Sequence, residues 1–292
     1  MNLTTCPRGH AVHFCATSRV MHRRSRAYHT GLLFAVALFL ACVSGTIGDE
    51  KDNSAELAKL ATADHFEAVT NDPGFPVKST YGLIRGTTPG KSAMQRYAGL
   101  FVHEFRLYPP ELIRRTQLKR VVFCEKLSFD GQTRNAVPDF EHDTLYLDVS
   151  RGGYSRDYLR EVIHHEFFHI IDYRDDGQLY TDDAWSALNP PGFKYGNGGK
   201  AAQGVATMGV LTDKFPGFLD EYATTAVEED KAEVFAHMVI DPDYVANRDK
   251  TDPVLTAKTK RMKELLVKFC PEMGPIFWKV VADSQEHAST RP

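Results

Sequence analysis

The most informative segment of this chain reads Val162-Ile163-His164-His165-Glu166-Phe167-Phe168-His169-Ile170-Ile171. His165 and His169 are four residues apart, so on a helix both imidazoles project from one face and can share one tetrahedral ion. Glu166 lies beside them, where it can accept a proton from a metal-activated water and pass it to a leaving amine. The apolar neighbours predict a buried helix, in which unpartnered histidines and a glutamate would cost free energy. The segment therefore predicts a zinc site with His165 and His169 as ligands and Glu166 as general base, the alternative being the polar face of an ordinary helix.

Two other histidine positions are interpreted differently. His164 points away from the face that carries His165, so we expect it to be a core histidine with satisfied hydrogen bonds, or a support for a ligand. The pair His103-Glu104 begins like the zinc motif but has Leu107 where a second histidine would stand. We interpret His103 and Glu104 as a surface pair.

A third protein ligand is expected from another element, because catalytic zinc sites normally use three. The candidates are carboxylates and His237. Glu229 and Glu233 are four residues apart on a predicted helix from about 228 to 240, and they face one way. One of them can bind the metal while the other orients a ligating histidine, and the spacing does not decide which. The alternative for the acidic start of this helix is a solvated end that favours the helix dipole.

The flanking patterns predict an α+β fold. Residues 121–127 are β-branched and aromatic, and residues 144–149 alternate apolar and polar side chains, so both segments are expected to be strands. Helices are expected before them (about 92–105), after them from a cap at Ser155, and near the C-terminus (about 255–269). There is no regular βαβ alternation. A long stretch from 178 to 226 is irregular, and its part from Trp185 to Gly199 is a candidate cleft wall or lid.

At this point the chain resembles the gluzincin-type zinc-binding metallopeptidases, and more distantly the lethal-factor-like and Pro-Pro endopeptidases. The resemblance rests on His165-Glu166-x-x-His169, followed by Tyr222 and by Glu229-Asp230-x-Ala232-Glu233, and it covers about residues 143–240. It implies a zincin-like domain whose active-site helix lies beside a small sheet.

The resemblance also implies roles for individual residues. His165, His169 and Glu229 would be the Zn²⁺ ligands, Glu166 the general base, Tyr222 a hydroxyl that stabilises the oxyanion, and Glu233 a support for the ligands. Lys231 departs from the family pattern, which tends to have an aromatic residue there. In such folds the strand before the active helix borders the cleft, so residues 144–149 either pair with an extended substrate at an exposed edge or form an ordinary internal strand.

The N-terminal segment has the features of an export signal. Basic residues at 22–26 precede an uncharged apolar run from Gly31 to Gly45, which is shorter than the ~20 residues that a spanning helix needs. We expect a cleaved signal peptide or an anchor at 1–48, a linker or loosely packed lead-in at 49–80, one catalytic domain at 81–282 and a tail at 283–292. The expected location is secreted or in the secretory lumen, with membrane attachment only if the segment is an uncleaved anchor.

Composition and cysteines set further limits. A net charge of −3 gives no general attraction to phosphate backbones, so no nucleic-acid partner is expected. A processed chain would keep Cys124 and Cys270, which form either one disulfide or two separate buried thiols.

The function expected from the sequence is zinc-dependent hydrolysis of peptide bonds in a peptide or protein substrate, by attack of metal-activated water. A secreted, noncatalytic, zinc-stabilised binding protein is the main alternative, and hydrolysis of a nonpeptide amide is a third.

Overall fold

The computed structural model describes residues 53–150, 155–198 and 208–289, with side chains to residue 285. In chain order the described elements are α1 (Asn53–Ala63), β1 (Glu67–Val69), β2 (Val77–Ser79), β3 (Gly82–Thr87), α2 (Lys91–Phe105), α3 (Pro110–Thr116), β4 (Arg120–Phe129), β5 (Gln132–Thr133), β6 (Ala136–Asp139), β7 (Thr144–Asp148), α4 (Arg156–Asp176), α5 (Asp183–Ser186), the 3₁₀ turn η1 (Tyr222–Thr224), α7 (Val227–Ile240), α8 (Pro242–Asp249), α9 (Pro253–Phe269), the 3₁₀ turn η2 (Pro271–Met273) and α10 (Pro275–Ser289). All the strands precede α4, and α7 to α10 follow it. The fold is α+β, as predicted.

One mixed sheet forms the N-terminal side of the domain. Its strand order is β2-β3-β4-β7-β6, and β1 and β5 also pair with β4. β4 runs parallel to β1 and β7, whereas the β2–β3, β3–β4 and β6–β7 pairs are antiparallel. β7 is therefore an internal strand, and all five of its residues are buried. Of the two alternatives for residues 144–149, the ordinary internal strand is observed.

The two faces of the sheet pack against different partners. Along β4, Val121 and Phe123 belong to the main core with α1, α2 and α4, whereas Val122 and Cys124 belong to a smaller cluster on the other face. This alternation is the period of two that a strand imposes on its side chains. The strand predicted for residues 121–127 is observed, and both of its faces are buried.

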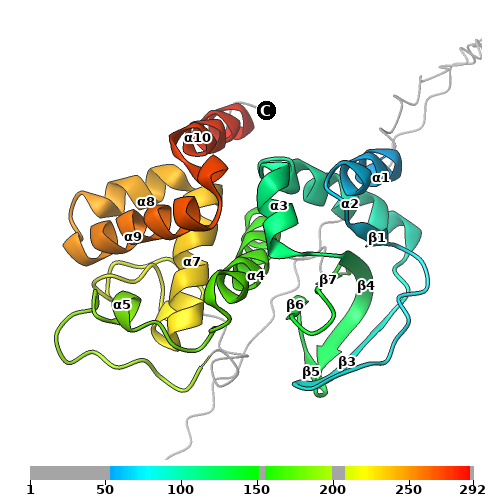
Figure 1. Cartoon of the computed structure of the whole chain (residues 1–292), viewed down its shortest axis with the longest axis horizontal. Coiled ribbons are helices and arrows are strands. Elements are labelled where there is room, and N and C mark those ends of the chain that lie inside the picture. Colours follow the sequence, from blue (N-terminus) through cyan, green and yellow to red (C-terminus); the bar gives the residue numbers. More distant parts are fainter. Residues whose placement is uncertain (1–52, 151–154, 199–207, 290–292) are drawn as a thin grey trace, which may run out of the picture. The chain divides into compact units, whose positions relative to one another are not determined.

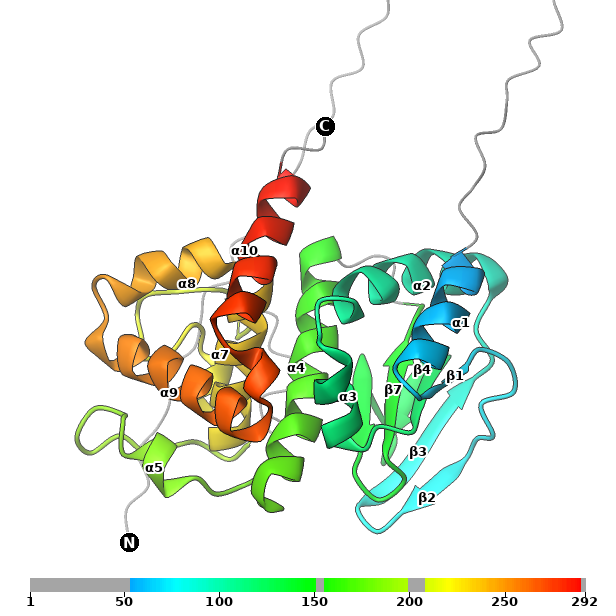
Figure 2. The same ribbon diagram turned by 45° about the horizontal axis from the view of Figure 1, so that its top comes forward.

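Helix α4 lies between the sheet and the C-terminal helices (Figures 1 and 2). Ser155 caps its N-terminus by accepting a hydrogen bond from Tyr158 N at 3.2 Å, and Gly177 ends it in the left-handed conformation. The start at Ser155 agrees with the sequence prediction. Because α4 is covered by β6 and β7 on one side and by α7 on the other, most of its residues are buried.

Residues 53–80, which we expected to be a linker or loosely packed lead-in, form α1, β1 and β2 instead. Leu57 and Leu60 of α1 join the main core, and β1 adds a parallel strand to β4. Helix α2 covers nearly the expected range of 92–105, and its N-cap is Gly90, which makes no side-chain capping bond. The apolar stripe of α1 consists only of Leu57, Leu60 and Ala61, which is too short to show a helical periodicity in the sequence.

The C-terminal boundary differs as well. Residues 283–289, expected to begin a tail, continue α10. The Gln285 side chain donates a hydrogen bond to the carbonyl of Val239 at 3.2 Å, so this turn of α10 contacts α7.

Cys124 and Cys270 are separate buried thiols, so the disulfide alternative is not observed. Cys124 lies in β4, where its Sγ is 3.6 Å from the carbonyl of Leu147, and Cys270 follows α9. Burial raises the pKa of the Cys124 thiol above its usual value.

The predicted signal segment at 1–48 lies outside the described residues, so cleavage and anchoring both stay predictions. Within residues 53–150, 155–198 and 208–289, no helix has the length and apolar character required to cross a membrane.

Candidate metal centre

Three side chains from two helices converge at the centre of the domain. The Nε2 atoms of His165 and His169 are 3.1 Å apart, and Glu229 Oε2 lies 3.0 Å from the first and 3.6 Å from the second. Zinc bonds of about 2.0–2.2 Å in a tetrahedron place neighbouring ligand atoms about 3.2–3.6 Å apart. The donor set and its separations therefore fit a zinc ion held by His165, His169 and Glu229.

The local sequence explains this convergence. The four-residue spacing on α4 stacks His165 and His169 on the face turned toward α7, and both are nearly buried. Glu229 lies in the first turn of α7, among three acidic residues that favour a helix N-terminus. His237, the other candidate ligand, lies two turns further along α7 and is not part of this group.

Glu233 contacts the same histidine from the opposite side. Its Oε1 is 2.9 Å from His165 Nδ1, so a proton on Nδ1 is held by the carboxylate and the Nε2 lone pair is left for a metal. Burial alone would raise the pKa of Glu229 and of Glu233, but hydrogen bonds from the histidines outweigh it and both pKa values lie below the usual range.

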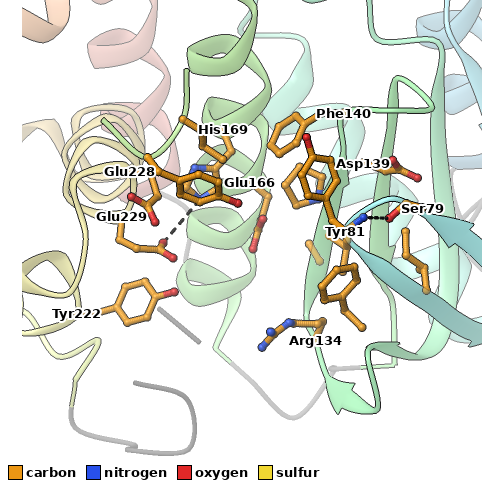
Figure 3. A pocket seen from close by; sticks show the side chains of 17 residues that line it. Ser79, Tyr81, Arg134, Asp139, Phe140, Glu166, His169, Tyr222, Glu228 and Glu229 are labelled. Carbon is orange, nitrogen blue, oxygen red and sulfur yellow. Dashed lines mark hydrogen bonds and ion pairs between the residues drawn. The ribbon is translucent and has the colours of Figure 1, made fainter. Parts of the chain in front are cut away.

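Glu166 and Tyr222 face a cavity of ≈ 340 Å³ that His169 and Glu229 also line (Figure 3). Burial raises the pKa of Glu166, and the nearby His165 and His169 oppose the rise. Burial, followed by the charges of Glu229 and Glu166, raises the pKa of Tyr222, so its hydroxyl keeps its proton. The ring centre of Tyr222 lies 6.1 Å from that of His165.

The opposite wall of the cavity comes from the sheet. Strand β6, the last strand in the sheet order, contributes Ala136, Val137, Pro138 and Asp139 to the lining. Pro138 is compatible with an edge position, because proline lacks a ladder donor. The strand that borders the cavity at the edge is therefore β6, whereas the sequence pointed to residues 144–149.

The long loop between α4 and α7 contacts α7 through Asp230, the residue that follows Glu229. Its carboxylate accepts hydrogen bonds from Trp185 Nε1 at 2.8 Å, Tyr195 Oη at 2.6 Å and Lys258 Nζ at 2.7 Å. Lys258 Nζ also lies 3.6 Å from the ring centre of Phe218. In the described part of the segment from Trp185 to Gly199, the aromatic side chains Trp185 and Tyr195 thus attach the loop to α7.

The ion pair of Asp230 and Lys258 supports a stability prediction. Both side chains are fully buried, and burial raises the pKa of Asp230 and lowers that of Lys258, so each charge is tolerated only beside the other. Lys258→Met should lower the free energy of unfolding by about 3–5 kcal/mol, because it leaves a buried carboxylate unpaired. Urea unfolding followed by circular dichroism measures the change.

Asp230→Asn combined with Lys258→Met is the control for this prediction, since it removes both charges. The double variant should be more stable than Lys258→Met alone. A double variant as unstable as the sum of the two single changes would show that the pair itself is not what matters.

Lys231 stands at the position where the metallopeptidase families named above tend to have an aromatic residue, and it forms two ion pairs there. Its ammonium group pairs with Asp172 of α4 and, at 2.9 Å, with Asp182, which caps α5. Lys231 therefore joins three elements around the centre, although the sequence left its packing open.

The position of Glu104 differs most clearly from the surface position that the sequence indicated. It is fully buried, accepts a hydrogen bond from Arg160 Nε at 2.8 Å, and lies 3.0 Å from His164 Nε2. The interpretation of Glu104 as part of a surface pair was wrong. His164 is fully buried and is also 2.6 Å from the hydroxyl of Tyr108, so it is a core histidine with satisfied hydrogen bonds, as expected.

Comparisons with known proteins support the fold. No known protein family and no curated protein matches the sequence. Among solved structures, the crystal structure of a "putative zinc-binding metallo-peptidase" from Bacteroides caccae is similar, with a TM-score of 0.53 and 18% sequence identity over 82% of this chain and 95% of that chain. At this identity the likeness concerns the fold alone, which is metallopeptidase-like.

Proposed function

We propose that this chain is a zinc-dependent peptidase. The observation that carries the proposal is the convergence of His165 Nε2, His169 Nε2 and Glu229 Oε2 within 3.0–3.6 Å, next to a cavity that Glu166 lines. The metallopeptidase-like fold supports the same proposal.

His165, His169 and Glu229 would hold the zinc ion. When bound, zinc is a Lewis acid that lowers the pKa of water and polarises a carbonyl group. Glu233 keeps the proton of His165 on Nδ1, so that Nε2 remains available as a ligand.

Glu166 would be the general base. It lies one residue after His165 on α4 and faces the cavity, where a water molecule and a scissile peptide can reach it. Because burial raises its pKa, the carboxylate is a better proton acceptor than an exposed glutamate, and it can then deliver the proton to the leaving amine.

Tyr222 would stabilise the negative charge that develops on the substrate oxygen. Its hydroxyl lines the cavity and stays protonated, so it can donate a hydrogen bond.

Tyr222→Phe should retain the bound metal and lower kcat by about 10²-fold, because one hydrogen-bond donor to the oxyanion is lost. KM should change little, since the hydroxyl matters mainly once charge has built up. Steady-state kinetics with metal analysis measures both. A Tyr222→Phe enzyme with the wild-type kcat would remove Tyr222 from this role.

The proposed substrate is an extended peptide or protein segment. The cavity lies between β6 and η1, and the edge position of β6 allows an extended chain to pair with its backbone. We propose no nucleic-acid partner, in line with the net charge of −3. Export, with membrane attachment only through an uncleaved N-terminal segment, remains part of the proposal.

Incubation of the purified full chain with a mixture of peptides tests the proposal. We expect new peptide termini to form, to disappear after treatment with a chelator and to reappear on addition of Zn²⁺. Tight zinc binding without any cleavage would favour a noncatalytic zinc-stabilised binding protein. Cleavage of simple amides but not of peptides would favour the third alternative.

A further inference from the structure

Three buried side chains and one partly buried side chain form a second group on the other side of His165, and we name it the rear cluster. Its members are Glu161 of α4, Asp220 before η1, and Glu233 and His237 of α7. His237 Nε2 lies 3.3 Å from Glu233 Oε2 and 4.0 Å from Glu161 Oε2. None of the four lines the cavity described above. The rear cluster is therefore separate from the proposed substrate site.

The rear cluster lacks the lysine or arginine partner that other buried carboxylates have. Glu104 pairs with Arg160, Asp172 with Lys231, and Asp230 with Lys258. Among the described residues, no lysine or arginine pairs with Glu161, Asp220 or Glu233. Two neighbouring carboxylates, Glu161 and Glu233, without a fixed cation are unfavourable in a largely buried environment.

Several polar atoms of the rear cluster have no hydrogen-bond partner. Within the described part of the chain these are Glu233 Oε2, Asp220 Oδ2 and both ring nitrogens of His237. The His237 side chain is only 5% exposed, and its Nε2 is directed at the two glutamates. Buried polar groups are nearly always satisfied, and Glu233 Oε2 and His237 Nε2 face each other at 3.3 Å without a hydrogen bond of acceptable geometry, which indicates that something binds between them.

We propose that the rear cluster binds a second divalent cation, with Glu161, Glu233 and His237 as ligands. One possible ligand atom from each of the three ligands lies within 4.8 Å of the others. In an octahedron with bonds of about 2.2 Å, neighbouring ligand atoms are about 3.1 Å apart and opposite atoms about 4.4 Å. The wider spacing and the oxygen-rich donor set favour a six-coordinate cation such as Mn²⁺ over tetrahedral zinc.

Glu233 would connect the two sites. Its Oε1 contacts His165 Nδ1 at 2.9 Å, and its Oε2 is the unpartnered atom that faces His237. A cation in the rear cluster would fix Glu233 and, through it, the ring of His165. Its role would be to position a ligand, and this inference does not depend on peptidase activity.

Protons are the alternative occupants of the rear cluster. Burial raises the pKa of Glu161 and of Asp220, and the neighbouring Glu233 raises both further. Neutral carboxylic acids would need no cation. The number of bound metal ions decides between the two.

The test is metal stoichiometry of the full chain. Metal-free protein is given excess Zn²⁺ and Mn²⁺, desalted, and analysed by inductively coupled plasma mass spectrometry, while electron paramagnetic resonance follows free Mn²⁺. We expect two ions per chain in the wild type. Glu161→Gln and His237→Ala should each bind one ion fewer and retain the first.

Asp157→Asn is the matched control, because it makes the same acid-to-amide change on α4 at a side chain that is 81% exposed. It should keep both ions. One ion per chain in the wild type at saturating metal would overturn the proposal whether or not the variants fold. Retention of the second ion in folded Glu161→Gln and His237→Ala would overturn it equally.

Discussion

Glu166→Gln is expected to lower peptide hydrolysis by at least ~100-fold while the metal content stays that of the wild type, because a general base commonly contributes 10²–10⁴. Glutamine has nearly the same shape as glutamate, so the cavity and the neighbouring ligands should be preserved. It cannot accept a proton from water. Single-turnover cleavage of a peptide identified with the wild-type enzyme, together with metal analysis, measures the effect.

Glu264→Gln is a control for this prediction, because it makes the same change on the exposed side of α9. It should leave both cleavage and metal content unchanged. Wild-type hydrolysis by Glu166→Gln would exclude Glu166 as the base. Loss of metal from that variant would mean that Glu166 acts on the ligands instead.

Glu229→Ala should remove most of the zinc, whereas Glu233→Ala should weaken zinc affinity by only about 10–100-fold. Glu229 Oε2 approaches both Nε2 atoms, at 3.0 and 3.6 Å. Of the two ligating histidines, Glu233 contacts His165 alone, at Nδ1 and at 2.9 Å. Removal of Glu229 takes away one of the three protein ligands, whereas removal of Glu233 leaves all three ligands in place. Competition with a chromogenic chelator measures the dissociation constant of the most tightly bound zinc ion in each variant.

Glu228→Ala is the matched control for the ligand prediction. Glu228 precedes Glu229 in the first turn of α7 but is not part of the converging group. It should keep the zinc. If Glu233→Ala empties the site and Glu229→Ala leaves it filled, the ligand assignment is wrong in register, and Tyr222 loses the basis of its role.

Local patterns predicted the elements that position the site. The cap at Ser155, the apolar neighbours of His165 and the glycine at 177 define α4 without any tertiary information. The five-residue alternation of β7 and the β-branched run of β4 likewise identify strands. What these patterns cannot decide is pairing order, and for that reason β6 and not β7 lies at the edge beside the cavity.

The contacts that pair distant charges could not be predicted from spacing. Glu104 occupies a position on the apolar stripe of α2 between Phe101 and Phe105, which was a signal that it is buried. Its partner Arg160 is more than fifty residues away, so no local pattern links the two. The same holds for Asp230 and Lys258, which join α7 to α9.

The sequence analysis considered only two of the residues in the rear cluster. His237 was considered as a zinc ligand and Glu233 as a support, but Glu161 lies one helical turn before His165 and was not considered. A glutamate four residues before the first histidine falls on the same helix face. That spacing was the available signal.

The central claim is that His165, His169 and Glu229 bind zinc. Anomalous diffraction at the zinc absorption edge, from crystals of the zinc-loaded chain, tests it most directly. The account predicts a zinc peak about 2.0–2.2 Å from both Nε2 atoms and from an oxygen of Glu229. A zinc-loaded crystal with no peak between these three side chains, or with Glu229 turned away from the ion, would contradict it.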